Sequence, residues 1–299
     1  MRTTLRLVSS VVLGVTVLLF TSTQAYAGQV PRGEFDANVV YGEDNRKDWY
    51  DSPDAGLREL ALSTVALVET RNIGATADGL TEIKGKHYGK TNQLCADEKF
   101  YDQTAAAFCS GFLVGPNKIV TAGHCVATEV DCARTNFVFG YAVKSVGELP
   151  THVASGEVYK CAKVVHSQAE GKGADYAIIE LDREVVGHTP LNLRKEGNAL
   201  TGDELVVIGH PAGLPSKIAD GAVVRTEAKN GFFVANLDTY GGNSGSAVFN
   251  TRTKEVEGIL VRGETDYVWK DGCVRSKVCA SNECRGEDVT AIANVLNYL

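Results

Sequence analysis

The sequence lacks the features that mark membrane-spanning, fibrous and nucleic-acid-binding proteins. Its longest apolar stretch runs from Leu7 to Phe20, and this is shorter than the ~20 residues that a membrane-spanning helix needs. No segment has low complexity, and no repeat recurs at the periods of solenoid proteins. Basic residues do not dominate either, since 30 Lys and Arg stand against 37 Asp and Glu, for a formal net charge of −7. This acidic balance argues against nucleic acid as the partner.

The cysteine spacing does not fit the common zinc-binding patterns. No two of the eight cysteines form a Cys-x2-Cys pair, which is the usual signature of a structural zinc site. We therefore expect no metal and no other cofactor. An even number of cysteines is instead typical of disulfides formed in an oxidising compartment, although spacing alone does not choose among the possible pairings. The eight are Cys95, Cys109, Cys125, Cys132, Cys161, Cys273, Cys279 and Cys284.

The N-terminal segment predicts a secretory signal peptide over residues 1–27. Arg2 and Arg6 precede the apolar stretch, and Ala25-Tyr26-Ala27 follows it as a small-residue cleavage site. A membrane anchor is the alternative, but the apolar stretch is too short for one, and no cysteine near the cleavage site can carry a lipid. Cleavage removes two arginines and no acidic residue, which changes the formal net charge from −7 to −9. We expect a secreted or periplasmic protein without a stable membrane anchor.

Residues 28–60 differ in composition from the rest of the chain. They are polar and contain Pro31, Gly33 and Pro53, which interrupt regular structure. This segment is interpreted as a propeptide, an extended N-terminal arm, or both. The remaining residues, 61–299, are expected to form the main domain.

From Leu62 onward, short β-type runs alternate with turn signals, which favours an all-β fold of small antiparallel barrels. The last segment, 288–299, has apolar residues at helical spacing and predicts an amphipathic helix packed on the second barrel. Its apolar positions are Val289, Ile292, Leu296 and Leu299. Strands are expected first at 63–70, 107–114, 118–121, 137–143, 157–165 and 176–181, and then at 204–208, 222–226, 232–237, 246–249 and 256–262.

Ser244 is the candidate nucleophile. It lies in the segment Gly241-Gly242-Asn243-Ser244-Gly245, just before a short apolar run, and this pattern predicts a tight turn that leads into a buried strand. A serine hydroxyl attacks a carbonyl only when a base accepts its proton and donors stabilise the oxyanion. Because Gly242 has no Cβ, its N–H and that of Ser244 can point to one position and form an oxyanion hole.

His124 and Asp175 are the candidate base and acid. His124 follows the apolar run 119–122, and Asp175 stands at the head of the apolar run 176–179. A histidine base needs a carboxylate on its second nitrogen, which fixes the tautomer and stabilises the imidazolium. The competing carboxylates are Glu180, interpreted as facing solvent, and Asp182, interpreted as a turn residue.

The histidine and serine segments together resemble motifs of the chymotrypsin-like serine proteases. Thr121-Ala122-Gly123-His124-Cys125 is similar to that family's histidine motif and Gly242-Asn243-Ser244-Gly245 to its serine motif, and His124, Asp175 and Ser244 occur in the family's order. The resemblance runs from about Leu62 to the C-terminus, and the branch most similar in appearance contains bacterial glutamyl endopeptidases and trypsin-like peptidases.

This resemblance implies an architecture and an activity. The fold would be two six-stranded antiparallel β-barrels, at about 61–185 and 200–285, followed by a C-terminal α-helix at 288–299. The protein would be a monomeric serine endopeptidase that acts on protein or peptide substrates. A disulfide between Cys109 and Cys125 would hold the turn that carries the histidine.

Residues near Ser244 indicate where a substrate side chain is expected to bind. The family places the base of that pocket six residues before the nucleophile, at Asp238 here, and a carboxylate there would favour Arg or Lys before the cut. Alternatively, Asp238 caps the turn before the serine motif. Thr239, Val261 and Gly263 complete the expected substrate-binding set.

Several positions depart from the patterns of related enzymes. Leu260 stands where glutamyl endopeptidases have a histidine, which argues against a preference for acidic side chains. Arg262 is expected either to neutralise Asp238 or to attract acidic substrates. Asn243 replaces the aspartate that captures the new N-terminus in trypsin-type enzymes, so that mode of activation is in doubt. The segment Val39-Val40-Tyr41-Gly42 resembles the mature N-terminus of the glutamyl-endopeptidase branch, and processing is expected near 38–40.

Two other classes of function match parts of the pattern. A catalytically inactive barrel that binds proteins is the first, but such proteins normally lose one of the three residues that are all present here. An esterase of the α/β-hydrolase type is the second. Its Gly-x-Ser-x-Gly turn is not matched, because Ser246 occupies the position of the last glycine.

Overall fold

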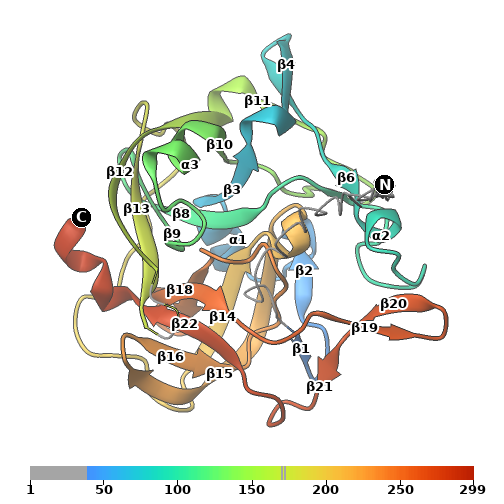
Figure 1. The fold of residues 1–299 in the computed structure, drawn as a ribbon, viewed down its shortest axis with the longest axis vertical. Helices are drawn as coiled ribbons and strands as arrows, with labels where there is room; N and C mark the ends of the chain where they lie inside the picture. Colours follow the sequence, from blue (N-terminus) through green and yellow to red (C-terminus); the bar gives the residue numbers. More distant parts are fainter. Residues whose placement is uncertain (1–38, 170, 172) are drawn as a thin grey trace, which may run out of the picture. The chain divides into compact units, whose positions relative to one another are not determined.

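The computed structural model describes residues 39–299 apart from residues 170 and 172. The predicted signal peptide, 1–27, and residues 28–38 of the predicted propeptide or arm lie outside the described residues. The described part consists mainly of strands, most of which build two barrels (Figure 1). Within that part, no helix has both the length and the apolar character needed to cross a membrane.

The first barrel is closed and has six strands in the order β10-β12-β13-β9-β8-β3, with β3 paired to β10 (Figure 1). Neighbouring strands are antiparallel, and large side chains such as Leu67, Phe112 and Phe137 fill the core. The strand expected at 137–143 begins earlier, at Thr135, and ends at Val138. The strands are β3 (Thr64–Glu69), β8 (Cys109–Gly115), β9 (Lys118–Thr121), β10 (Thr135–Val138), β12 (Val158–Ala169) and β13 (Asp175–Leu181).

The second barrel is formed by the C-terminal half of the chain, in orange and red in Figure 1. Its six strands follow the order β14-β17-β18-β22-β16-β15, and β14 pairs with β15 to close the ring. The all-β class with two six-stranded antiparallel barrels is therefore confirmed. The strands are β14 (Glu204–Gly209), β15 (Lys217–Lys229), β16 (Phe232–Ala235), β17 (Ala247–Asn250), β18 (Val256–Arg262) and β22 (Glu287–Ala291).

Alternate residues of the second barrel pack toward the first. Leu205 and Val207 of β14 lie in the core of the second barrel, whereas Val206 and Ile208 belong to the same apolar cluster as the core of the first. This follows from the two-residue period of a strand, whose successive side chains point to opposite faces. The two barrels are thus joined by a continuous apolar contact.

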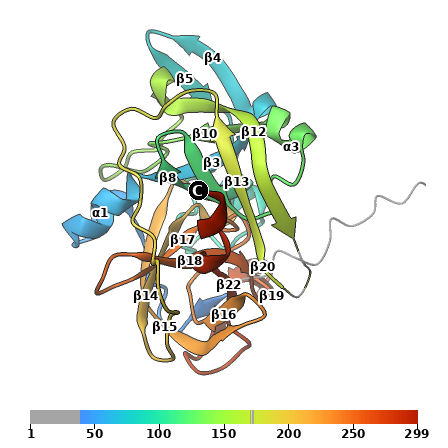
Figure 2. The same ribbon diagram turned by 90° about the vertical axis from the view of Figure 1, so that its left-hand side faces the viewer.

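The predicted C-terminal helix is wrong. Residues 287–291 form β22, whose pairing with β16 and β18 completes the second barrel. The strand satisfies the backbone N–H and C=O groups on both sides, and apolar spacing alone did not reveal those partners. Two 3₁₀ turns follow, at Ile292–Asn294 and Leu296–Tyr298. They pack on both barrels, since residues 292–294 contact β18 of the second, and the rings of Tyr298 and of His166 on β12 of the first stack with centroids 3.9 Å apart. Figure 2 shows this C-terminal segment, in dark red, facing the viewer.

Smaller elements lie in the loops. A three-stranded sheet has the order β11-β5-β4, and the pairs β6–β7 and β19–β20 are two-stranded. These strands are β4 (Ile73–Ala77), β5 (Leu80–Ile83), β6 (Lys86–His87), β7 (Thr104–Ala105), β11 (His152–Ala154), β19 (Tyr267–Lys270) and β20 (Cys273–Ser276). The helices are α1 (Ala55–Ala61), α2 (Tyr88–Thr91) and α3 (Glu129–Arg134), and 3₁₀ turns lie at Trp49–Asp51, Thr70–Asn72, Ser155–Glu157 and Pro211–Gly213.

All eight cysteines lie within the described residues and form disulfides. One bridge, Cys109–Cys125, joins β8 to the loop after β9. Another, Cys95–Cys273, joins the segment between β6 and β7 to the β19–β20 hairpin across 178 residues of sequence, and a closed loop of that length strongly restricts the unfolded chain. The other bridges are Cys132–Cys161 and Cys279–Cys284.

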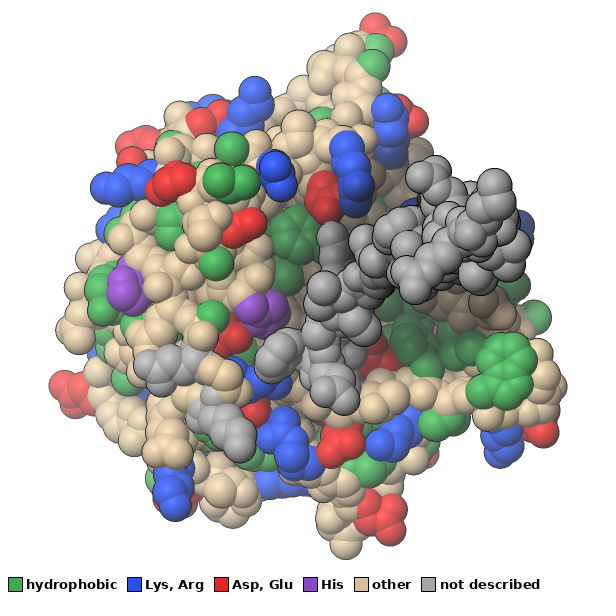
Figure 3. Space-filling model, in the orientation of Figure 1, with side chains coloured by type: hydrophobic (Ala, Val, Ile, Leu, Met, Phe, Trp, Pro, Cys, Tyr) green, Lys and Arg blue, Asp and Glu red, His purple; other side chains and the backbone are tan. Residues whose placement is uncertain are grey.

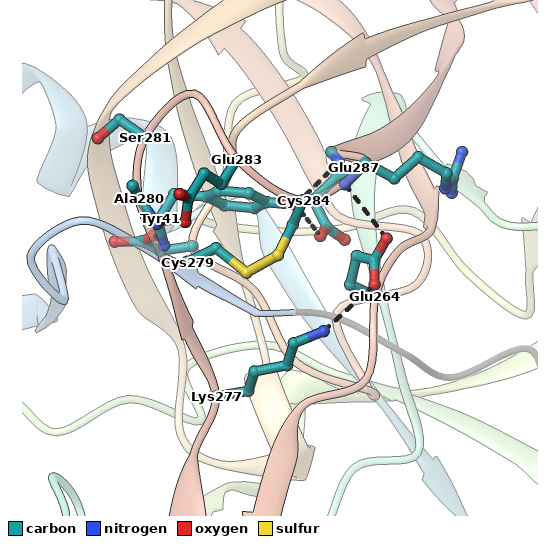
Figure 4. Close-up of a disulfide and its surroundings, with 12 residues drawn as sticks. Tyr41, Glu264, Lys277, Cys279, Ala280, Ser281, Glu283, Cys284 and Glu287 are labelled. Atoms are coloured by element: carbon teal, nitrogen blue, oxygen red, sulfur yellow. Dashed lines mark hydrogen bonds and ion pairs between the residues drawn. A yellow bond between two sulfur atoms is a disulfide. The ribbon is translucent and has the colours of Figure 1, made fainter.

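The N-terminal arm, residues 39–48, pairs with strands of the C-terminal half. β1 (Val40–Tyr41) runs parallel to β21 (Val278–Cys279), and β2 (Arg46–Asp48) adds to β15. The ring of Tyr41 lies beside the Cys279–Cys284 disulfide, and its hydroxyl donates to Glu287 over 3.3 Å and accepts the N–H of Gly286 over 3.0 Å (Figure 4). The arm is therefore an integral part of the folded domain.

Candidate active site

His124 and Asp175 meet at one edge of the first barrel. β9 ends three residues before His124, and Asp175 opens β13, which pairs with β9 so that Ala177 faces Thr121. Nδ1 of His124 lies 2.7 Å from Oδ2 of Asp175, and the backbone N–H of His124 donates to Oδ1 over 3.1 Å. Because an ionised carboxylate only accepts hydrogen bonds, Nδ1 carries the proton and Nε2 of the neutral ring has a free lone pair.

The turn before His124 depends on a glycine. A Cβ at Gly123 would stand 2.1 Å from the carbonyl oxygen of Gln168 on β12, so a larger residue would force the histidine turn away from the barrel. The adjoining Cys125 is bonded to Cys109 of β8. The turn is thereby held on both sides of His124.

Asp175 is buried, with 4% of its surface exposed, and the second barrel holds its backbone. The hydroxyl of Thr290 on β22 donates to its carbonyl oxygen and accepts its N–H, both over 3.0 Å. The competing carboxylates lie toward the opposite end of β13. There Asp182 accepts the N–H of Lys160 over 3.1 Å.

Ser244 lies on the turn between β16 and β17, against the first barrel. Its carbonyl oxygen accepts the N–H of Ser110 over 2.8 Å and lies 3.7 Å from Sγ of Cys125, the residue next to His124. Its surface is 5% exposed. Within the described part of the chain, neither the hydroxyl of Ser244 nor Nε2 of His124 forms a hydrogen bond. The turn thus brings Ser244 to the same end of the first barrel as the His124–Asp175 pair.

Gly242 has a conformation that other residues adopt rarely. Its φ is +93°, and a Cβ there would meet the nitrogen of Gly213 at 2.8 Å. Among the described residues, the N–H groups of Gly242 and Ser244 donate no hydrogen bond. The other N–H groups of residues 241–246 all donate hydrogen bonds. Gly241 donates to Asp266, Asn243 to Tyr240, Gly245 to Leu260 and Ser246 to Asn243. This alternation leaves open the two donors that were predicted to form an oxyanion hole.

A cavity of about 270 Å³ is lined in part by the start of this turn. Gly241 and Gly242 form one wall, and Phe108 and Tyr267 contribute aromatic surface from the two halves of the chain. Asp266 is also in the lining, and its carboxylate accepts the N–H of Gly241 over 3.1 Å. Gly242, one of the two predicted oxyanion donors, thus lies in the lining of this cavity.

Asp238 binds the N-terminal arm. Its Oδ1 accepts the N–H of Tyr41 over 2.7 Å and its Oδ2 the N–H of Asn45 over 2.8 Å. Burial raises the pKa of Asp238 to about 6, although these two donors act in the opposite direction. Both oxygens of the predicted pocket base therefore already have partners.

The other predicted substrate-binding residues are not gathered around an exposed charge. Thr239 is buried and donates from its hydroxyl to Glu287 over 3.2 Å. Val261, which is 1% exposed, and Gly263 flank Arg262 at the end of β18. The guanidinium of Arg262 contacts Asp288 and Asp175, contacts that no local sequence pattern indicated.

One group of ligand-type atoms lies near the site. Sγ of Cys109, Sγ of Cys125 and a ring nitrogen of His124 fall within 4.8 Å of one another. The two sulfur atoms are joined in a disulfide, so they do not provide the thiolates that bind zinc.

Comparisons with known proteins bear on the family and the fold of this chain. A family model described as "Trypsin-like peptidase domain" matches residues 109–259, about half of the chain. The glutamyl endopeptidase of Bacillus licheniformis is 29% identical over 148 residues, which are 47% of this chain and 45% of that protein. The match therefore spans less than half the length of that relative.

The solved structure titled "Structure of Glu endopeptidase in complex with MPD" has a similar fold. It is 19% identical, with a TM-score of 0.50, and the match covers 87% of this chain and 97% of that one. The predicted resemblance to chymotrypsin-like enzymes is confirmed. Since the family model spans His124, Asp175 and Ser244, and the two-barrel fold extends beyond it, this chain belongs to the trypsin-like peptidase family.

Proposed function

We propose that the protein is a secreted serine endopeptidase in which Ser244 is the nucleophile, His124 the base and Asp175 the acid that orients the base. The observation that carries the proposal is the 2.7 Å hydrogen bond between Nδ1 of His124 and Oδ2 of Asp175. It places the proton on Nδ1 and leaves Nε2 as the acceptor for a serine proton.

The geometry supports acyl transfer in two halves. His124 accepts the proton of Ser244 as the hydroxyl attacks a peptide carbonyl, and the open N–H groups of Gly242 and Ser244 stabilise the oxyanion. His124 then protonates the leaving amine, and water repeats the sequence to release the acid. Hydrogen bonds between base and nucleophile are often long in ligand-free sites and shorten when substrate binds, which fits the free hydroxyl of Ser244.

Secretion is part of the proposal because two features support it. The sequence begins with a signal-like segment at 1–27, and the four disulfides suit an oxidising compartment. Acidic and basic side chains are interspersed on the face shown in Figure 3. Such a mixed surface fits peptide substrates better than it fits a polyanion.

A preference for a basic residue before the cut stays a prediction, and the position of Asp238 weakens it. Both of its oxygens accept N–H groups of the arm, so a substrate cation would have to compete with these bonds. A relative is named glutamyl endopeptidase, but Leu260 replaces the histidine expected for acidic substrates. A peptide library varied at the residue before the cut distinguishes a basic from an acidic preference. Enrichment of Lys and Arg among the cleaved peptides supports the basic preference, and enrichment of Glu supports the acidic one.

The decisive experiment is covalent labelling with an organophosphonate. The purified protein should lose proteolysis and acquire one label on Ser244, whereas the Ser244→Ala protein should stay unlabelled and fold normally. Ser246→Ala is the matched control, since Ser246 lies in the same turn and should leave labelling intact. Labelling of Ser244→Ala overturns the proposal, and a protein that is never labelled but binds another protein supports the inactive-barrel alternative.

A further inference from the structure

We propose that Arg262 is a positioning residue for the reaction, a cation that the second barrel supplies to the carboxylate of Asp175. The inference rests on the proposed function, since it concerns the acid that orients His124. Arg262 is not proposed to touch the reacting atoms. It acts through Asp175.

The first observation is the contact itself. Nη1 of Arg262 lies 3.8 Å from Oδ2 of Asp175, the same oxygen that lies 2.7 Å from Nδ1 of His124. Both side chains are largely buried, at 11% exposure for Arg262 and 5% for Asp175. Burial matters because two charges that are shielded from solvent interact more strongly than two charges exposed to water and salt.

The second observation is that the guanidinium is held in place from several directions. Its Nη2 donates to the carbonyl oxygen of Gly173 over 2.8 Å, and its Nε donates to Oδ2 of Asp288 over 3.1 Å. The group also lies over the ring of Phe232, with its carbon 5.5 Å from the ring centroid. A planar guanidinium fixed by two acceptors and a ring has little freedom to turn away from Asp175.

A purely structural role, in which Arg262 only neutralises the charge of Asp288, does not account for this geometry. Asp288 already has a second cation, since Nη1 of Arg285 lies 2.6 Å from its other oxygen. The charged or titratable side chains that the structure describes around Asp175 are His124 from the first barrel and Arg262 from the second, with Asp288 behind the latter. The arginine therefore bridges the two acids.

The backbone and the side chain of Asp175 are therefore held by different residues. Thr290 holds its backbone, and Arg262 restrains the oxygen that binds the imidazole. Without the guanidinium, Oδ1 of Asp175 still accepts the N–H of His124, but Oδ2 loses a fixed cation. The imidazole then spends less time with Nε2 directed at Ser244, and small misplacements of catalytic groups lower rates strongly. We expect kcat to respond and KM to change little.

The test begins with Arg262→Met, which keeps a long apolar side chain over Phe232. We expect kcat to fall about tenfold with KM unchanged within about twofold, and Arg262→Lys to recover most of the loss because it restores a cation. Arg285→Met is the matched control, because it removes the other cation of Asp288 without a contact to Asp175, and it should change kcat less than about twofold. Equal losses in Arg262→Met and Arg285→Met overturn the inference.

A double-mutant cycle with Asp175→Asn tests whether Arg262 acts through Asp175. If Arg262 acts through Asp175, adding Arg262→Met to Asp175→Asn should change kcat less than about twofold, whereas independent effects multiply. Multiplying effects overturn the inference but leave the proposed function intact, provided that Ser244→Ala remains unlabelled by the phosphonate. Labelling of Ser244→Ala overturns both. If Arg262→Met does not fold, the same cycle is run with Arg262→Gln.

Discussion

The two barrels contribute to the site in different ways. The first barrel brings His124 and Asp175 together through the register of two neighbouring strands, β9 and β13. The second barrel presents Ser244 on a turn whose position depends on contacts from distant segments. Asp266 of the hairpin region binds Gly241, and the carbonyl of Ser244 binds Ser110.

The difference indicates which kind of change each half tolerates. Strand register is maintained by many backbone hydrogen bonds, so a side chain at the edge of the first barrel can change without moving its neighbours. The turn of Ser244 is held by a few individual hydrogen bonds, and Gly242 and Gly245 in it have positive φ. A substitution there therefore alters the backbone conformation as well as the chemistry. We expect substitutions in the first barrel to lower the rate and substitutions around the turn to lower both rate and stability.

The largest effect is expected from Asp175→Asn. The amide cannot hold the Nδ1–H of His124 in the same tautomer, and kcat should fall by about 10⁴-fold. The strand register should survive because the hydrogen bonds of Thr290 are to the backbone of Asp175. Peptide hydrolysis measures the rate, and Asp182→Asn, at the opposite end of β13, serves as the control. A comparable loss in the control contradicts the assignment of Asp175.

Gly242→Ala should affect rate and stability together. The alanine Cβ meets the nitrogen of Gly213 at 2.8 Å while φ is +93°, so the turn must move and the oxyanion donor moves with it. We expect kcat to fall by about 10²–10³-fold. Gly202→Ala separates the two causes, since Gly202 has φ +90° with nothing within 4 Å of its Cβ. Gly202→Ala should cost about 1 kcal/mol of stability and leave kcat unchanged, as measured by urea unfolding and hydrolysis.

Asp238→Asn tests whether remote contacts maintain the second barrel's share of the site. One oxygen becomes an NH₂ donor, so either Tyr41 or Asn45 loses its acceptor, at a cost of about 1–3 kcal/mol. The arm should then be cleaved faster in limited proteolysis. The control is Asp220→Asn, which removes a partly exposed ion pair with Lys47 of the same arm and should cost less than about 1 kcal/mol. If Asp238→Asn instead leaves the arm protected and abolishes cleavage after Lys and Arg, the specificity role of Asp238 is supported.

Near neutral pH the smallest effect is expected from His210, because its contribution changes only as the pH falls below about 6.5. Burial lowers the pKa of His210 from 6.5 to about 4, and this residue lies directly beneath the turn, with its carbonyl oxygen 3.0 Å from the Cβ position of Gly242. The unfolded state binds the proton first, so stability is retained above pH 6.5 and falls as the pH drops from about 6.5 toward 4. His210→Gln should reduce this slope by up to about 1.4 kcal/mol per pH unit, measured by urea unfolding at several pH values. An unchanged slope would show that other groups cause it.

The candidate site was predictable where chemistry and local pattern coincide. The local patterns around Ser244, His124 and Asp175 made each a candidate, and the resemblance to the family's motifs and their order joined the three into one predicted site. The contacts of Arg262 and Asp238 were not predictable, because their partners lie far away in sequence. Asp238 binds Tyr41 across 197 residues, and no local pattern encodes such a pair.

The C-terminal segment shows the same limit for the fold. The apolar spacing of 288–299 is helical, yet residues 287–291 form a strand because β16 and β18 offer hydrogen-bond partners on both sides. Periodicity reports which residues become buried, but not which backbone groups are available nearby.

The amino-acid sequence alone was enough to predict an all-β fold of two barrels and the three side chains proposed to carry out the reaction. These depend on residue type and on period-two burial, which are properties of short segments. Only the tertiary structure decided that β22 completes the second barrel, that the arm occupies Asp238 and that Arg262 reaches Asp175. Each of these depends on which distant groups remain unpaired when the chain is compact, because buried polar and charged groups must find partners wherever the fold provides them.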